Sequence, residues 1–139
     1  MSNPSYVPRH FVVPAYDFGQ REDVQWREPD EAWTARKVAQ LEASRLQHRI
    51  CFGVAQLYMP QSDFTKYTKL AEALDVPYGP LYKKLTGHAV MKLEDIGRLR
   101  RHIGPRLDYW LLGTQTASSV RLIEKQLHEA HLQRATQRH

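Results

Sequence analysis

The sequence predicts an all-α domain, and three observations support this fold class. Apolar residues recur at helical spacing in several segments between residues 30 and 113. No segment alternates apolar and polar residues over the length of a strand, and no internal repeat is present. With 139 residues, of which 42% are hydrophobic, the chain fits one small domain with tails.

Residues 1–29 are predicted to form an extended N-terminal arm outside the core. The first half of this arm holds three prolines, which exclude a continuous helix: Pro4, Pro8 and Pro14. Two interpretations of the arm stay open. It is either loosely docked, with an extended piece at Phe11–Tyr16 packed on the domain, or it reaches DNA or a partner subunit through Arg9 and His10.

The folded domain is predicted to span residues 30–113 and to begin with a helix over residues 30–59. Pro29, Asp30 and Glu31 suit a helix start. Its apolar face is Trp33, Val38, Leu41, Ile50, Val54 and Leu57. Because Gly53 weakens a helix, one bent helix and two consecutive helices are both open. His48 and Cys51 share a side of this segment, but no further ligands at metal-site spacing accompany them, so no metal site is predicted.

Residues 67–87 hold two short helices joined by a tight turn. Their inward positions are Leu70, Ala71 and Leu74 in the first helix, and Leu81 and Leu85 in the second. Asp75-Val76-Pro77 interrupts the helical pattern, and Val76 is expected to be buried at the turn. Gly87 ends the second helix, because glycine adopts the left-handed conformation of a helix C-terminus without strain.

Two helices are expected after this motif. The first covers residues 92–102, with an apolar stripe of Leu93, Ile96, Leu99 and Ile103. The second covers residues 107–112 and packs Leu107, Tyr109, Trp110 and Leu111. Residues 114–139 are predicted to be a linker and an amphipathic tail, with Val120, Ile123, Leu127 and His131 on one face. A frayed terminal helix and a dimerisation helix over residues 120–132 are the two interpretations of that tail.

Charge and composition narrow the function. The net charge is +5, and residues 64–113 carry nine Lys and Arg against five Asp and Glu, which favours an acidic partner. The lone cysteine excludes an internal disulfide, and neither a membrane-length apolar run nor a signal peptide is present, so we expect a cytoplasmic protein. No phosphate loop, catalytic carboxylate pair or catalytic triad is apparent, so no enzyme activity and no cofactor are predicted.

Residues 64–113 resemble the lambda-repressor-like, Cro-type helix-turn-helix family of phage immunity repressors and bacterial transcriptional regulators. LAEALDV matches the first motif helix, PYGPLYKKLTG the turn and recognition helix, LEDIGRLRRHIG the next helix and LDYWLLG the closing helix. The resemblance implies a five-helix bundle. Three residues depart from the family pattern: Asp75 at a turn position that is often glycine, Pro80 in the recognition helix, and Lys84 at a position that is often apolar.

The resemblance also implies how the domain would bind DNA. The residues expected to face bases are Tyr78, Gly79, Tyr82, Lys83 and Thr86. The residues expected to contact phosphates are Lys66, Thr68, Lys84, Lys92 and His88. The implied function is a sequence-specific double-stranded DNA-binding regulator, a phage or prokaryotic repressor that occupies its operator as a homodimer or a monomer. The alternative is a protein-interaction module, such as an antitoxin or adaptor, with these tyrosines and lysines merely covering its surface.

Overall fold

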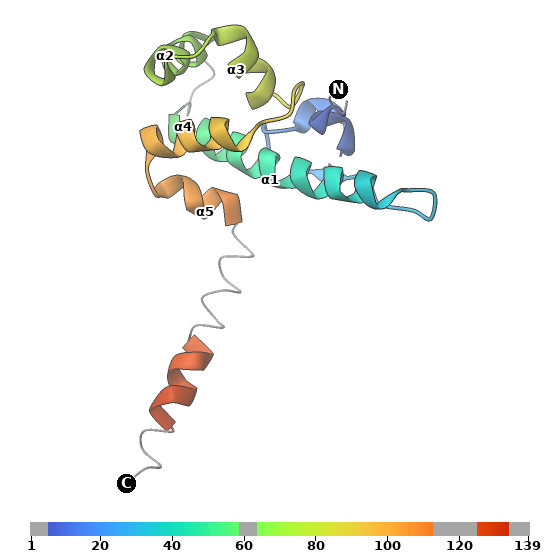
Figure 1. The fold of residues 1–139 in the computed structure, drawn as a ribbon, viewed down its shortest axis with the longest axis vertical. Helices are drawn as coiled ribbons and strands as arrows, with labels where there is room; N and C mark the ends of the chain where they lie inside the picture. Colours follow the sequence, from blue (N-terminus) through green and yellow to red (C-terminus); the bar gives the residue numbers. More distant parts are fainter. Residues whose placement is uncertain (1–5, 59–63, 113–124, 134–139) are drawn as a thin grey trace.

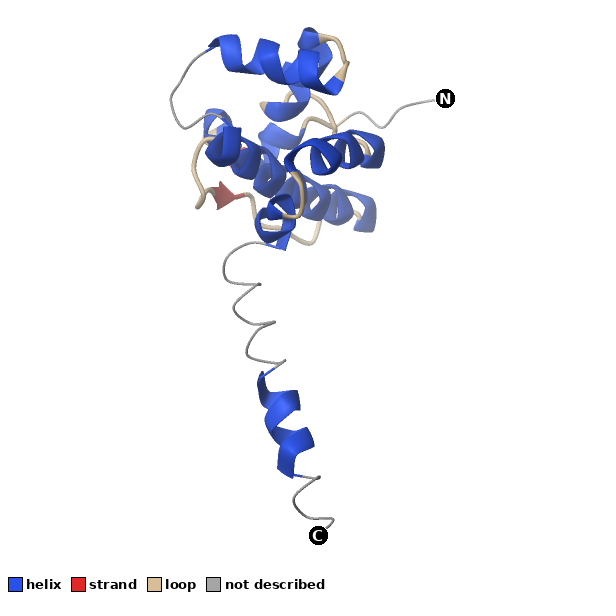
Figure 2. Ribbon diagram, turned by 90° about the vertical axis from the view of Figure 1, so that its left-hand side faces the viewer, coloured by secondary structure: helices blue, strands red, loops and turns tan. Residues whose placement is uncertain are grey.

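The computed structural model describes residues 6–58, 64–112 and 125–133, and helices make up most of them (Figure 1). The elements in chain order are η1 (Pro8–Phe11), β1 (Val12–Val13), η2 (Ala15–Asp17), β2 (Gln25–Trp26), α1 (Ala35–Tyr58), α2 (Phe64–Leu74), α3 (Tyr78–Leu85), α4 (Leu93–Ile103) and α5 (Arg106–Leu112). The mostly helical class is therefore confirmed. The sequence did not predict the small antiparallel pair of β1 and β2, in which Val12 pairs with Trp26. Strands are coloured red in Figure 2.

Helix α1 is one unbroken helix that packs mainly against α5 and η1. It begins after Thr34, whose hydroxyl accepts a hydrogen bond from the Lys37 N–H at 3.1 Å, a typical N-terminal cap. Gly53 does not interrupt the helix. A Cβ atom at this position would lie 2.5 Å from Trp110 Cβ, so the glycine allows α5 to approach α1 closely.

Helices α2 and α3 meet at a tight turn of the expected kind. Asp75 has a φ of 56°, which confirms that this residue supplies the left-handed conformation. The Val76 N–H donates to the Ala71 carbonyl at 3.0 Å and the Asp75 N–H to the Glu72 carbonyl at 3.1 Å, which is the Schellman pattern. Val76 is half-buried against the core, beside the buried Ala71.

The inward stripes of α2 and α3 are confirmed, and that of α4 needs one correction. Leu70, Ala71, Leu81, Leu85 and Leu99 are buried. Leu93, which was predicted to be inward, is 86% exposed. At 100° per residue it lies about 90° around α4 from the centre of the face formed by Ile96, Leu99 and Ile103.

The N-terminal segment is built into the core, which corrects the expectation of a loosely docked arm. Phe11, Val12 and Phe18 are each at most 5% exposed. The buried ring of His48 on α1 holds the segment in place, since its Nδ1 accepts a hydrogen bond from the Gly19 N–H at 2.8 Å and its Nε2 lies 3.2 Å from the Glu22 carbonyl. Burying several large apolar side chains outweighs the irregular backbone that the prolines impose.

The tail contributes one helix, over residues 125–133, and all of its side chains are exposed. Leu127 and Leu132 are 66% and 52% exposed. Val120 and Ile123, the other apolar residues of the predicted dimerisation face, lie outside the described residues. Among the described helices, none combines the length and apolar character needed to cross a bilayer.

Candidate nucleic-acid interface

Helix α3 buries one side and exposes the other. Leu81 and Leu85 point into the core, whereas Tyr78, Gly79 and Lys83 are exposed. Pro80 sits at the third position of the helix without displacing its start, because the N–H groups of a first helical turn have no intrahelical acceptor to lose. The outward side of α3 is therefore available to a partner.

Three tyrosine rings pack together at the start of α3. Tyr82 stacks on Tyr78, with ring centroids 5.8 Å apart, and meets Tyr67 of α2 edge-on at 5.4 Å. Burial of Tyr67 raises the pKa of its phenol. Tyr82 is half-buried in this stack and Tyr78 is 40% exposed, so Tyr78 offers the more accessible ring.

Gly79 lies in open space on the same side of α3. A Cβ atom built on it would meet nothing within 4 Å, and its φ is not in the left-handed region. Glycine within a helix costs about 0.5–1 kcal/mol relative to alanine. Neither packing nor backbone geometry within the described chain explains this cost, so the bare backbone here suits close approach by a partner.

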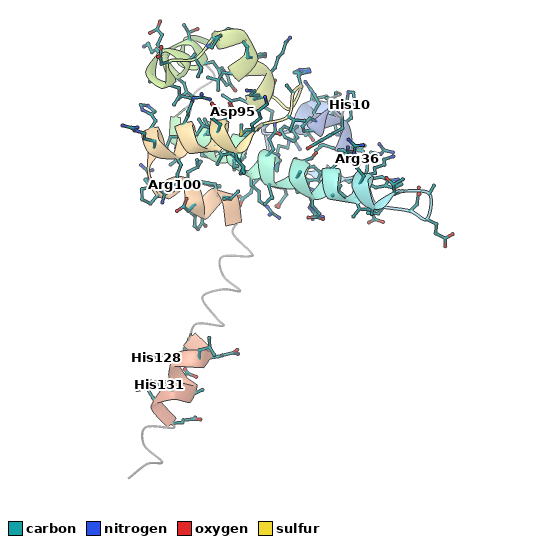
Figure 3. The ribbon with its side chains drawn as sticks, in the orientation of Figure 1. His10, Arg36, Asp95, Arg100, His128 and His131 are labelled. Carbon is teal, nitrogen blue, oxygen red and sulfur yellow. The ribbon has the colours of Figure 1, made fainter. Side chains whose placement is uncertain are left out.

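Two adjacent lysines, both predicted to contact DNA, have different surroundings. Lys83 is exposed, and within the described residues it takes part in no ion pair. The Lys84 ammonium lies 3.0 Å from the Asp95 carboxylate of α4, with both side chains less than a quarter exposed. Figure 3 labels Asp95 on α4. Asp95 also accepts the Lys92 N–H at 2.8 Å and so caps α4. Lys84 thus ties α3 to α4.

The other residues predicted to contact DNA differ in exposure and in whether their side chains already form hydrogen bonds. The Thr86 hydroxyl donates to the Tyr82 carbonyl at 2.8 Å, so it is already engaged at the end of α3. Thr68 on α2 and Lys92 before α4 are exposed. Lys66 lies on α2, but its side chain is outside the described residues.

Gln47 of α1, which sequence reasoning missed, holds the far end of α3. Its buried amide nitrogen donates to the Lys84 carbonyl at 2.8 Å and to the Ala89 carbonyl at 2.9 Å. Its amide oxygen accepts the Met91 N–H at 2.9 Å. A single side chain therefore fixes both α3 and the loop that leads to α4. Nothing in a helical pattern distinguishes such a glutamine from a solvated one.

The N-terminal segment meets the same end of α3. The Arg9 N–H donates to the carbonyl of Gly87 at 2.9 Å, and the Arg9 guanidinium contacts the ring of His88. Gly87 has a φ of 79°, which confirms its predicted role, and a Cβ there would lie 2.5 Å from the Phe18 ring. The glycine thus ends the helix and also lets the N-terminal segment lie against it.

Comparison with protein-family models, with curated proteins and with solved structures found no match. Within residues 6–58, 64–112 and 125–133, no group of three or more His, Cys, Asp or Glu residues is arranged to hold a metal ion. The outward side of α3, with its flanking cations, is the site that these contacts define best.

Proposed function

We propose that the protein is a sequence-specific double-stranded DNA-binding regulator, a phage or prokaryotic repressor that works in the cytoplasm. Helices α1 to α5 act as a Cro-type bundle in which α2 and α3 are the helix-turn-helix pair. The observation that carries the proposal is the outward side of α3, where Tyr78, Gly79 and Lys83 are exposed while Leu81 and Leu85 anchor the helix.

The geometry suits entry of α3 into a groove. A major groove about 12 Å wide admits one α-helix, and base edges are met mainly by residues near the start of that helix. Gly79 permits close approach there, and Tyr78 presents an aromatic ring to thymine methyl groups. Lys83, one turn further on, donates to guanine O6 and N7.

Residues flanking α3 position the domain on the DNA backbone. Thr68 of α2 and Lys92 before α4 are exposed and supply contacts to phosphate, which fix register but carry no sequence information. Repression then needs no chemistry, because a domain seated on its operator blocks polymerase. Lys84 is left out of this interface because Asp95 already pairs with it.

The experiment compares Lys83→Ala with its neighbour Lys84→Ala on a duplex selected from a random library. Lys83→Ala should weaken binding by about 1–3 kcal/mol, or roughly 5- to 150-fold, and relax specificity at one base pair. Lys84→Ala should lower stability instead, with little loss of affinity for the selected duplex. Binding should also weaken steeply with salt as counterions are released.

Two results would overturn the proposal. One is failure of the wild-type protein to enrich any duplex, which would leave the protein-interaction module as the better account. The other is equal affinity of Lys83→Ala and the wild type. Footprinting on the selected duplex also gives the stoichiometry, because a dimer protects two symmetric half-sites about 10 base pairs apart and a monomer protects one.

A further inference from the structure

Four nitrogen-bearing side chains from three segments gather at the C-terminal end of α3. Arg9 and His10 come from η1, Lys83 from α3, and His88 from the loop that follows it. Figure 3 labels His10 on the N-terminal segment. Three of the four side chains are exposed and Arg9 is half-buried. We call this group the η1–α3 cluster.

The backbone beneath the η1–α3 cluster is held in place on several sides. The His88 and Ala89 N–H groups donate to the Lys83 carbonyl at 2.8 and 3.2 Å, and the Arg9 N–H donates to Gly87. The Ala89 carbonyl in turn accepts the amide of Gln47. The backbone of the cluster is therefore preorganised, so a ligand does not have to order it.

The η1–α3 cluster contains no carboxylate, and two of its members, Arg9 and Lys83, are positively charged at neutral pH. The charged groups that act on His88 are Arg9, His10 and Lys83, while the neighbouring α1 side chain, Gln47, is uncharged. Burial first, and then these cations, lower the pKa of His88. Within the described residues, neither Arg9 nor Lys83 forms an ion pair with a carboxylate. The repulsion among these groups is thus left uncompensated, and an anion would relieve it.

The contact between Arg9 and His88 also indicates which nitrogen of the His88 ring carries the proton when no ligand is bound. A guanidinium only donates hydrogen bonds, so the His88 Nε2 must accept, which places the proton on Nδ1 of a neutral ring. An arriving phosphate offers the guanidinium two acceptor oxygens, which Arg binds in bidentate fashion. His88 Nε2 is then released and can take up a proton from solvent to become a second donor.

We propose that the η1–α3 cluster is a binding site for a phosphate group, and that binding is coupled to protonation of His88. The inference rests on the proposed function only for the source of the phosphate, which is then the DNA backbone beside the end of α3. A free phosphate or a phosphorylated small molecule has the same chemistry. The two sources are distinguished by experiment.

The direction of the pH dependence follows from linkage. The pKa of His88 lies below its usual value of about 6.5 in the free protein and rises when an anion binds. Affinity therefore increases as pH falls from neutral, approaching roughly ten-fold per pH unit for uptake of one proton.

The test follows the His88 ring by NMR in the full chain, with His88→Gln used to assign its signal. The ring is titrated alone, with inorganic phosphate, and with the duplex selected from the random library. Sodium chloride matches the ionic strength in each case, which separates binding from screening. In parallel, duplex affinity is measured against salt for the wild type, for Arg9→Gln and for Arg101→Gln, which removes the same charge from α4.

The inference expects both ligands to raise the pKa of His88, and Arg9→Gln to reduce the salt slope by about one unit beyond Arg101→Gln. If phosphate raises the pKa but the duplex does not bind, the phosphate site stands and the DNA proposal fails. If the duplex binds while the pKa of His88 and the slope of Arg9→Gln stay unchanged, the phosphate site is wrong and the DNA proposal stands. A pKa that neither ligand moves also overturns the inference.

Discussion

Replacing Gln47 by alanine should loosen the end of α3 from the bundle. This glutamine makes three buried hydrogen bonds, to the Lys84 carbonyl, the Ala89 carbonyl and the Met91 N–H. Alanine makes none of them, and the side chain is only 4% exposed, so water has poor access to the groups left behind. The substitution thus tests whether one side chain positions α3.

The size of the effect can be worked out bond by bond. The Lys84 carbonyl keeps two weaker donors, the Gly87 N–H and the Cys51 thiol, each at 3.4 Å. The Ala89 carbonyl and Met91 N–H lose the partner described for them. Since a stranded buried polar group costs about 1–3 kcal/mol, we expect Gln47→Ala to reduce the free energy of unfolding by roughly 2–4 kcal/mol.

Urea denaturation at neutral pH measures this loss as a lower midpoint at constant slope. Gln47→Glu is the matched variant, because it keeps the shape but turns a carboxylate oxygen toward two carbonyl oxygens. Its deficit relative to the wild type should shrink at acidic pH, where the protonated carboxyl can donate once. A Gln47→Ala protein within about 0.5 kcal/mol of the wild type would refute the anchoring role.

Three further outcomes are expected. Gly53→Ala should lower the free energy of unfolding by about 1–3 kcal/mol in a urea titration, since its Cβ would strike Trp110. The control, Gly97→Ala on α4, meets no atom within 4 Å and should gain up to about 1 kcal/mol, and equal responses would contradict the close approach of α5. Gly79→Ala should also gain stability yet weaken binding to the selected duplex, and unchanged affinity would remove Gly79 from the interface. Burial lowers the pKa of His48, so below about pH 6.5 the unfolded chain binds more protons than the folded one. The free energy of unfolding should therefore fall with decreasing pH by up to about 1.4 kcal/mol per unit, and His48→Gln should flatten this slope. A wild-type profile as flat as that of the variant would contradict the role of His48.

Local chain chemistry explains what could be predicted of the fold. The α2–α3 turn depends on short-range signals, namely leucines four apart, a residue that tolerates a positive φ at Asp75, and a glycine at position 87. All of them act within a few residues of one another. The docking of the N-terminal segment depends instead on Phe18 meeting Gly87 and His48, which are distant in sequence. Prolines suggest an irregular backbone but do not say whether it is buried.

In the candidate site too, local sequence predicts some features, and others depend on how distant elements pack. Exposure of Gly79 and Lys83 follows from helical periodicity, since the inward leucines define the opposite side. Tyr78 lies three residues before Leu81, on the leucine side, and is exposed as the first residue of α3. The pairing of Lys84 with Asp95 does not, because an ion pair between two helices depends on how they cross. The phenylalanines and valines of residues 11–18 could have indicated that the N-terminal segment packs on the domain. That prediction would have placed Arg9 next to the site.

The anchoring of η1 on Gly87 also bears on the order of folding. The contacting residues Arg9 and His88 are 79 positions apart in the chain. During synthesis, the residues of η1, which precede α3 in the chain, must therefore wait for the last turn of α3 before they can dock. Contacts of such long sequence separation form late and slow the folding reaction. The end of α3 should consequently be among the last parts of the bundle to reach its native form, well after α1 and the α2–α3 turn.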